Sequence, residues 1–145
     1  MKLSMKGDYG IRALVDLAEH FGEGPVQSRD IAQRQAIPEP YLDQLLTILR
    51  KAGLIHSRRG PQGGHILARE PGEVSLSEVV AALEGSASVI GCLDGTFDCS
   101  FSGRCGQQEI WDLVTAAGRK ILDGTSISNL LERQHARQQR QMYYI

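Results

Sequence analysis

The order of apolar patterns across residues 8–70 most constrains how this chain can fold. Residues 8–21 place four apolar side chains on one helical face, with i, i+3, i+4 and i+7 spacing: Leu14, Leu17, Ala18 and Phe21. Ser28 is a candidate N-cap for a short helix over 28–35. A third helix over 39–52 carries a leucine stripe, and Gly53 is placed to end it. These patterns predict three successive helices.

A hairpin with a basic, glycine-rich turn follows the three helices. Two short β-type runs, over 54–57 and 65–68, flank a turn that carries Arg58 and Arg59. The order of helix, short helix, polar-faced helix and basic hairpin is typical of a winged helix-turn-helix. We therefore predict a mainly α protein with a small β-hairpin wing, in which residues 28–51 form the helix-turn-helix and residues 54–68 form the wing.

The polar face of the third helix supplies candidate base contacts. Gln44 can pair with adenine and Asp43 can accept a hydrogen bond from cytosine. Tyr41 is either a further DNA contact or an aromatic residue at the edge of the core. A basic hairpin can be a solvated turn, but two arginines after a helix-turn-helix pattern favour contact with the DNA backbone. Glycines there would allow close approach to phosphate, so the candidate wing contacts are Arg58, Arg59, Gly63 and Gly64.

The second half of the chain predicts a further set of helices. Ser75 or Ser77 caps a helix that runs through Leu83, after a linker over 71–74. A long helix over 107–122 has an apolar arc, including Trp111, that one side of a small domain cannot cover. We expect that helix to pack on a partner subunit. The predicted units are 1–84 for DNA binding, 85–106 for a cysteine loop, 107–134 for the dimerisation helix plus a short C-terminal helix, and 135–145 for a loosely ordered tail.

The only three cysteines, Cys92, Cys99 and Cys105, have the spacing C-x6-C-x5-C within a glycine-punctuated stretch. This spacing matches neither the CxxC runs of ferredoxins nor a zinc ribbon. An odd count leaves one thiol without a disulfide partner. A polar, glycine-rich setting favours an iron–sulfur centre over buried inert thiols. A metal-free thiol switch and a zinc site remain alternatives.

Composition and charge set the class of protein. The 145 residues, 41% hydrophobic and 23% charged, suit one soluble domain, or one small domain plus an arm. The N-terminus has no secretory pattern and no apolar run approaches a membrane span, so we expect a cytoplasmic protein without a membrane partner. Residues 1–70 carry 10 Lys/Arg and 8 Asp/Glu, whereas residues 71–132 carry 3 and 9. A mildly basic first half and an acidic second half fit a DNA reader joined to a module that does not bind DNA.

The run LRKAGLIHSRRGPQGGHILA over 49–68, together with the cysteine triplet, resembles the Rrf-two family of bacterial transcription regulators. The similarity is to its iron–sulfur members of the IscR and NsrR type, and it extends from Met1 to about residue 130. It implies a homodimer that binds near-palindromic, double-stranded promoter DNA, with repression expected. Ser28, at the start of the helix-turn-helix, joins the candidate DNA contacts. The resemblance also implies that a [2Fe-2S] or [4Fe-4S] cluster, held by Cys92, Cys99 and Cys105, reports iron–sulfur status, oxygen, nitric oxide or redox state.

The sequence departs from the family pattern at two positions. Pro40 stands where relatives often carry a small hydroxyl residue, so the target DNA sequence does not transfer. Gln108 stands where some members supply a histidine ligand, which leaves the fourth cluster ligand open. Asp8 of the partner subunit is our candidate, as in some nitric-oxide-sensing relatives; its plain interpretation is an acid at a helix start. Weaker candidates are His65, Gln108 and Glu109.

Three functions remain to be separated at this point. The first is a transcription regulator whose DNA affinity depends on an iron–sulfur cluster. The second is a repressor without a cluster, either with a thiol switch or with inert thiols. The third is an iron–sulfur carrier or an enzyme, but the chain has no P-loop, no dinucleotide-binding glycine pattern and no Ser/His/Asp set. We therefore expect a regulator and not an enzyme.

Overall fold

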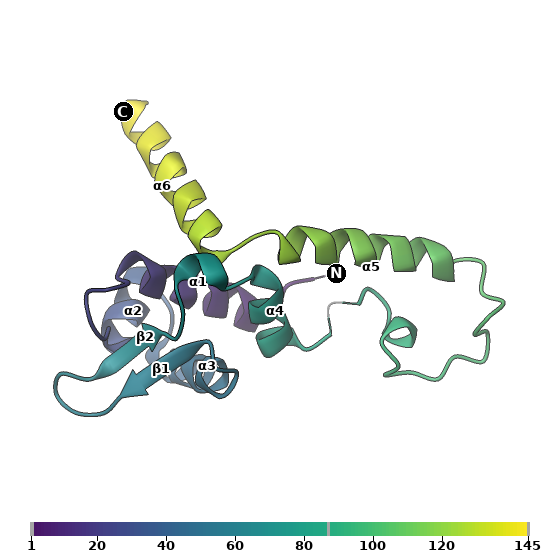
Figure 1. Cartoon of the computed structure of the whole chain (residues 1–145), viewed down its shortest axis with the longest axis horizontal. Coiled ribbons are helices and arrows are strands. Elements are labelled where there is room, and N and C mark those ends of the chain that lie inside the picture. Colours follow the sequence, from purple (N-terminus) through teal and green to yellow (C-terminus); the bar gives the residue numbers. More distant parts are fainter. Residues whose placement is uncertain (1, 87, 145) are drawn as a thin grey trace.

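A computed structural model describes residues 2–86 and 88–144; Met1, Ala87 and Ile145, which several predicted ranges include, lie outside them. The described chain holds six α-helices, a two-stranded antiparallel sheet and two short 3-10 helices. A body on one side of the molecule carries the hairpin, and the cysteine loop and α5 extend away from it (Figure 1). In chain order the elements are α1 (Met5–Glu19), α2 (Ser28–Gln35), α3 (Glu39–Lys51), β1 (Ile55–Arg58), β2 (Gly64–Leu67), η1 (Pro71–Glu73), α4 (Leu76–Glu84), η2 (Gly91–Leu93), α5 (Gln108–Asp123) and α6 (Ile127–Tyr143).

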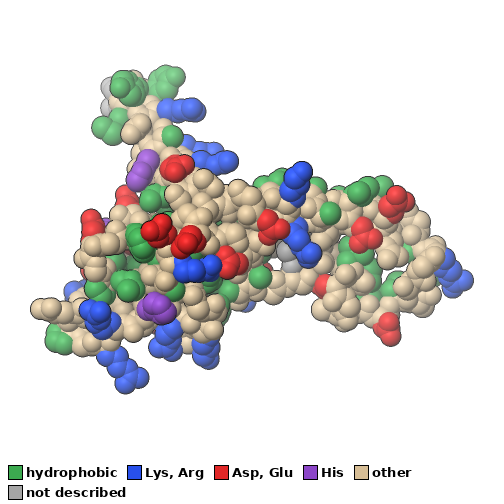
Figure 2. Space-filling view, viewed as in Figure 1, with side chains coloured by type: hydrophobic (Ala, Val, Ile, Leu, Met, Phe, Trp, Pro, Cys, Tyr) green, Lys and Arg blue, Asp and Glu red, His purple; other side chains and the backbone are tan. Residues whose placement is uncertain are grey.

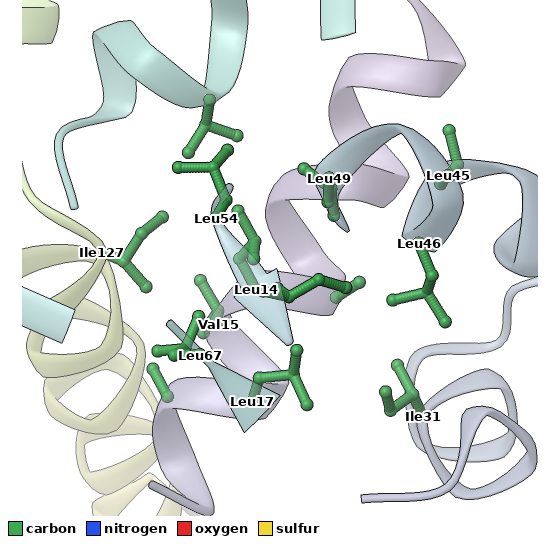
Figure 3. Close-up of a cluster of buried hydrophobic side chains, with 14 of the residues drawn as sticks. Leu14, Val15, Leu17, Ile31, Leu45, Leu46, Leu49, Leu54, Leu67 and Ile127 are labelled. Carbon is green, nitrogen blue, oxygen red and sulfur yellow. The ribbon is translucent and has the colours of Figure 1, made fainter. Parts of the chain in front are cut away.

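Helix α1 is the centre of the body, and it packs against α2, α3, α4 and α6. Its buried face meets the leucine stripe of α3, so the apolar spacing read from the sequence does form the core (Figure 3). The two strands of the wing pair in the register Ile55↔Leu67 to Arg58↔Gly64. The predicted mainly α architecture with a β-hairpin wing is confirmed. The largest fully buried side chains are Leu14, Leu17, Ile31, Leu42, Leu45, Leu46, Leu49, Ile55, Leu83, Ile127, Val74 and Val79.

The starts of the first two helices differ from the prediction. Helix α1 begins at Met5, because the Ser4 side chain accepts a hydrogen bond from the Gly7 amide and caps it. Phe21, predicted on the buried face, lies beyond the helix end and is 44% exposed. Ser28 is the first residue of α2 and not its cap. The cap position belongs to Gln27, which makes no capping hydrogen bond through its side chain.

The C-terminal segment also differs from the prediction, because α6 runs to Tyr143 instead of ending near residue 134. A capping box between Ser126 and Asn129 starts this helix. No glycine or proline follows up to Tyr143, and arginine and glutamine are good helix formers, so nothing in the sequence ends the helix earlier. Residues 135–143 are therefore helical and not a loosely ordered tail. Figure 1 shows α6 projecting from the body on the side away from the hairpin.

Helix α4 connects the body to the cysteine loop. Ser75 caps it through a capping box with Glu78, as one of the two predicted serines. Its main neighbours are α1, α3 and α5. The contact with α1 is close because Gly10 has no side chain, and a Cβ there would overlap Leu83 of α4. Within residues 2–86 and 88–144, no helix combines the length and the apolar character that a membrane crossing needs.

Candidate DNA interface and cysteine loop

Helix α3 has one buried face and one polar face. Asp43 and Gln44 are exposed on the polar face, as a helix that reads bases requires. Tyr41 is half-buried, and its ring meets the Tyr9 ring of α1 edge to face, with centroids 5.8 Å apart. Tyr41 therefore lies at the edge of the core, next to the exposed face. Of the three predicted base contacts, Asp43 and Gln44 are the two that solvent reaches freely.

The base of the wing is fixed to the loop before α2. Val26 donates to the His65 carbonyl at 2.9 Å, and His65 donates back to the Val26 carbonyl at 2.8 Å. Gly64 packs on the Val26 backbone with φ of 150°, where a Cβ would overlap. Gly63 is buried, and a Cβ there would meet the Arg58 carbonyl. Close backbone packing is thus sufficient reason for both glycines in the wing.

An open hollow of about 480 Å³ separates the start of α2 from the wing. Four of the predicted DNA contacts line it: Ser28, Arg58, Gly63 and Gly64. Arg59 is exposed at the wing turn, and Figure 2 shows Lys and Arg side chains gathered on the hairpin side of the body. Gln27 and Arg29, which were not among the predicted contacts, also line the hollow. The position of Arg29 at the start of α2 is visible in the sequence, but its place beside the wing depends on how the two segments pack.

His65 is a residue of the wing strand β2, and Asp43 and Arg50 of α3 lie near it. Its Nδ1 lies 2.8 Å from the Ser57 hydroxyl. Burial lowers the pKa of His65 below its ordinary value, partly offset by the nearby Asp43 carboxylate, while Arg50 lowers it further. The imidazole is therefore neutral near neutral pH, and it acts as a packing residue at the wing base instead of adding positive charge.

The three cysteines lie in the loop between α4 and α5. All three are free, half-buried, and line one hollow of about 320 Å³. Aromatic residues close part of this hollow, including Trp111, whose indole N–H donates to Gln107 Oε1 at 3.0 Å. The hollow is otherwise lined by Ile90, Leu93, Gly95, Phe97, Asp98, Phe101, Ser102, Gln107 and Gln108.

Of the other candidate cluster ligands, one lines the cysteine hollow and the others lie outside it. Gln108 lines the cysteine hollow, whereas His65 lies at the wing and Glu109 does not face the hollow. Asp8 lies in the first turn of α1, where its carboxylate is 3.5 Å from the Arg12 guanidinium. Among the residues that the structure describes, no three His, Cys, Asp or Glu side chains are gathered closely enough to hold a metal ion. The cysteines share one hollow, but their sulfurs do not converge.

A three-helix unit with a wing, an exposed polar face on α3, and a hollow beside the wing that Arg29 and Arg58 line together with Glu39 define a winged-helix DNA-binding protein. Residues 3–133 match the Rrf2 family, described as an iron-dependent transcriptional regulator. The chain therefore belongs to the Rrf2 family of transcriptional regulators, and it is a DNA-binding regulator and not an enzyme.

Curated and solved relatives agree with this assignment. The transcriptional regulator CymR of Bacillus subtilis is 34% identical over 145 residues, which is 100% of both chains. The regulator IscR of Aliivibrio salmonicida is 40% identical over 90% of this chain and 77% of its own. The structure of B. subtilis CymR, titled the global cysteine regulator, superposes with a TM-score of 0.80 over 92% of this chain and 98% of that one. IscR of T. potens superposes with a TM-score of 0.74 at 42% identity, over 92% and 88% of the two chains.

Proposed function

We propose that this regulator is a homodimer whose affinity for promoter DNA depends on an iron–sulfur cluster in the cysteine loop. The observation that carries the proposal is the single hollow lined by Cys92, Cys99 and Cys105. Free cysteines in a well-packed protein are usually buried as small apolar side chains. These three are instead half-buried around a shared space in a module attached to a DNA reader. The similarity to IscR proteins supports the same interpretation.

The chemistry of the donor set fits such a cluster once the loop closes. Thiolates are the usual ligands of iron–sulfur clusters, and when bound a cluster of this kind supplies a redox-active iron centre. None of residues 85–106 that the structure describes belongs to an α-helix or a strand, so the loop can draw its three sulfurs together at little packing cost. Trp111 and the aromatic residues of the hollow would limit access of water. Gln108 or the partner subunit's Asp8 would complete the coordination.

The path from the loop to the DNA reader is short. Helix α4, which ends where the loop begins, packs on both α1 and α3. Its contact with α1 is tight at Gly10, so movement at the end of α4 is transmitted instead of being absorbed by loose side chains. Ordering of the loop would therefore bias the position of α3 in each subunit and the spacing of the two recognition helices.

Helix α5 is the proposed dimer seam. Its apolar residues are uncovered within the chain: Ile110 is 56% exposed, Leu113 61%, Val114 43% and Ile121 68%. An apolar stripe of this size on a soluble protein usually marks an interface. A second copy fits because promoter half-sites with two-fold symmetry are read by dimers.

The test is anaerobic purification of the full chain, followed by absorption and EPR spectra and by iron and sulfide analysis. Wild type should be coloured, and Cys92→Ala, Cys99→Ala and Cys105→Ala should each lose most iron and sulfide. Ser100→Ala, in the same loop, is the matched control and should keep both. DNA shift assays on cluster-loaded and cluster-free protein should give different affinities. Wild type that stays colourless after anaerobic reconstitution would defeat the iron–sulfur proposal.

Asp8 is tested in the loaded protein. Asp8→Ala should keep the fold and the dimer, because an exposed carboxylate in a first helical turn contributes only about 0.3–1 kcal/mol. It should change the EPR spectrum and the rate of cluster decay in air, and Asp8→Cys should slow that decay. Asp30→Ala, which removes an acid from the first turn of α2, is the control. Spectra and decay rates unchanged in both Asp8 variants would leave Asp8 with its helix-start role alone.

A thiol switch without metal is the second candidate. The observation that favours it is that the three cysteines are free and their sulfurs do not converge on one point. In that case metal-free protein would change its DNA affinity on treatment with peroxide and recover it with a thiol reductant. Mass spectrometry would then show a disulfide or sulfenic acid in the cysteine loop.

A further inference from the structure

A polar cluster joins α1 to α2 inside the DNA reader. Asp16 of α1 is 1% exposed and is the charged residue within the core. Its two oxygens accept from Arg34, at 2.9 Å from Nε and 2.7 Å from Nη2, and Gln35 Nε2 donates at 3.1 Å. A buried carboxylate needs such donors, because it would otherwise be too costly to remove from water. The paired fork of Arg34 is the most directional contact that a carboxylate can make.

Helix α2 depends on this cluster more than its neighbours do. Only Ile31 and Ala32 of its eight residues are buried, and no side chain caps its start. By comparison, α3 buries four leucines. Apolar packing thus holds α2 at two adjacent points only, which leaves its tilt on α1 weakly determined. The fork between Asp16 and Arg34 supplies a third, directional point.

The cluster lies where α2 turns into α3. Arg34 and Gln35 are the last two residues of α2, and Ala36 follows with φ of 51°, in the left-handed region. Arg12 of α1 also donates to the Gln35 carbonyl. The α2 end of the turn is therefore tied to α1 by polar contacts, and the start of α3 follows directly from the placement of this turn.

We propose that Asp16 is a positioning residue for DNA recognition, which sets the angle of α2 and the entry of α3 relative to the wing through Arg34 and Gln35. The inference rests on α3 and the wing forming the DNA interface. Apolar packing in the core gives the body its stability, and packed helices can still slide slightly past one another. A forked, charge-assisted contact does not tolerate such sliding, so losing it broadens the orientations of α3 without unfolding the body.

The test compares specific and non-specific DNA binding. The probes are a duplex selected from a random pool by the wild-type protein and a shuffled duplex of the same composition. Asp16→Asn removes a negative charge, so electrostatics alone would strengthen binding to both duplexes. Positioning predicts the opposite for the selected duplex: about a tenfold loss of the affinity ratio between selected and shuffled DNA, with binding to the shuffled duplex kept.

Two further variants separate positioning from stability. Asp16→Leu with Arg34→Met replaces the ion pair by apolar side chains, a change that can leave stability unaffected or raised. It should fold and still lose the ratio about tenfold, as should Asp16→Asn if that variant folds. Val79→Ala, a destabilising change in α4, should keep the ratio. An unchanged ratio in the double variant would overturn the proposal, whatever the outcome for Asp16→Asn.

Failure of the interface itself gives a different pattern. If α3 and the wing are not the DNA interface, Gln44→Ala and Arg59→Ala will bind both duplexes as wild type does. If the interface is correct and only the positioning role is wrong, those two variants will lose affinity while the Asp16 variants keep the full ratio.

Discussion

The DNA reader (residues 2–84) and the cysteine arm (residues 85–86 and 88–123) of this protein differ in whether their apolar side chains are buried within the chain. In residues 2–84 the apolar faces of four helices and the hairpin are buried against one another, and Ile127 of α6 closes the core. In residues 85–86 and 88–123, no residue is buried, although α5 carries a strong apolar stripe. The reader is therefore stable by its own packing. The apolar stripe of the arm is not covered within the single chain, and a second copy along α5 and a ligand in the loop are what we propose to complete it.

The largest effect should come from the core of the reader. Leu14→Ala removes a fully buried side chain and should cost about 2–5 kcal/mol of unfolding free energy, through lost burial and the cavity left behind. Met142→Ala, at a residue 77% exposed in α6, should change stability by less than about 0.5 kcal/mol. Urea unfolding at several protein concentrations measures both. A Leu14→Ala loss as small as that of Met142→Ala would mean that the reader is not self-contained.

The next largest effect should come from α5, and it should depend on protein concentration. Val114→Asp would place an unpaired charge in the proposed seam and weaken the dimer by about 3 kcal/mol. Arg119→Asp, on a different face of the same helix, is the control. Sedimentation should show Val114→Asp as a monomer at concentrations where Arg119→Asp is a dimer. A tight Val114→Asp dimer would place the seam elsewhere and break the contrast between reader and arm.

The DNA affinity of a wing variant tests whether the reader binds DNA through its own residues. Arg59→Ala should lower affinity about tenfold, or about 1.4 kcal/mol, and reduce the slope of log K against log salt by about 1 if the contact is to phosphate. Arg133→Ala in α6 removes a positive charge away from the wing and should leave the slope unchanged. Binding titrations at several salt concentrations measure both. An Arg59→Ala protein with wild-type affinity and slope would remove the wing from the interface.

A smaller effect should come from the turn between α2 and α3. Ala36 holds a left-handed conformation with φ of 51°, which costs an alanine more than a glycine. Ala36→Gly should therefore raise stability by about 0.5–1 kcal/mol. Ala52→Gly, at a right-handed position after α3, should lower it slightly. Thermal unfolding compares the two, and equal losses in both would mean that the turn relaxes when the chain is free to move.

The smallest effect should be the pH response of His65. Burial lowers its pKa, so the unfolded chain takes up a proton first as the pH falls through the ordinary value of about 6.5. Its contribution to stability is present above that value and is lost as the pH drops toward the lowered pKa. Between about pH 7 and about pH 5.5, His65→Gln should lose less stability than wild type. His56→Gln, at an exposed histidine of β1, should follow wild type.

Sequence patterns predicted the reader well because its signals are local. The leucine spacing of α3, the Ser75 cap and the glycine-rich turn each act over a few residues, and the structure realises all three. Boundaries were less well predicted where a competing contact decides them. Ser4 caps α1 earlier than expected, and Gln27 takes the cap position that Ser28 was expected to hold.

The candidate site was only partly predictable. The wing arginines and the cysteine triplet stand out in the sequence by type and spacing. Arg29 did not, because its place beside the wing follows from the packing of two segments about thirty residues apart. The burial of Asp16 was also not predictable, because a single acid on an amphipathic helix gives no sign that it will be buried.

By itself the sequence determined which helices and which hairpin form, and their winged-helix order, because periodicity, caps and turn residues act locally and lie in consecutive positions. The 49–68 motif and the cysteine triplet indicated the family. Only the tertiary structure decided which polar groups meet. It buried Asp16 against Arg34 and Gln35, lowered the pKa of His65 at the wing base by burial, and gathered three cysteines around one hollow without bringing their sulfurs together. These outcomes depend on distances between segments far apart in the chain, which close packing fixes and local patterns do not.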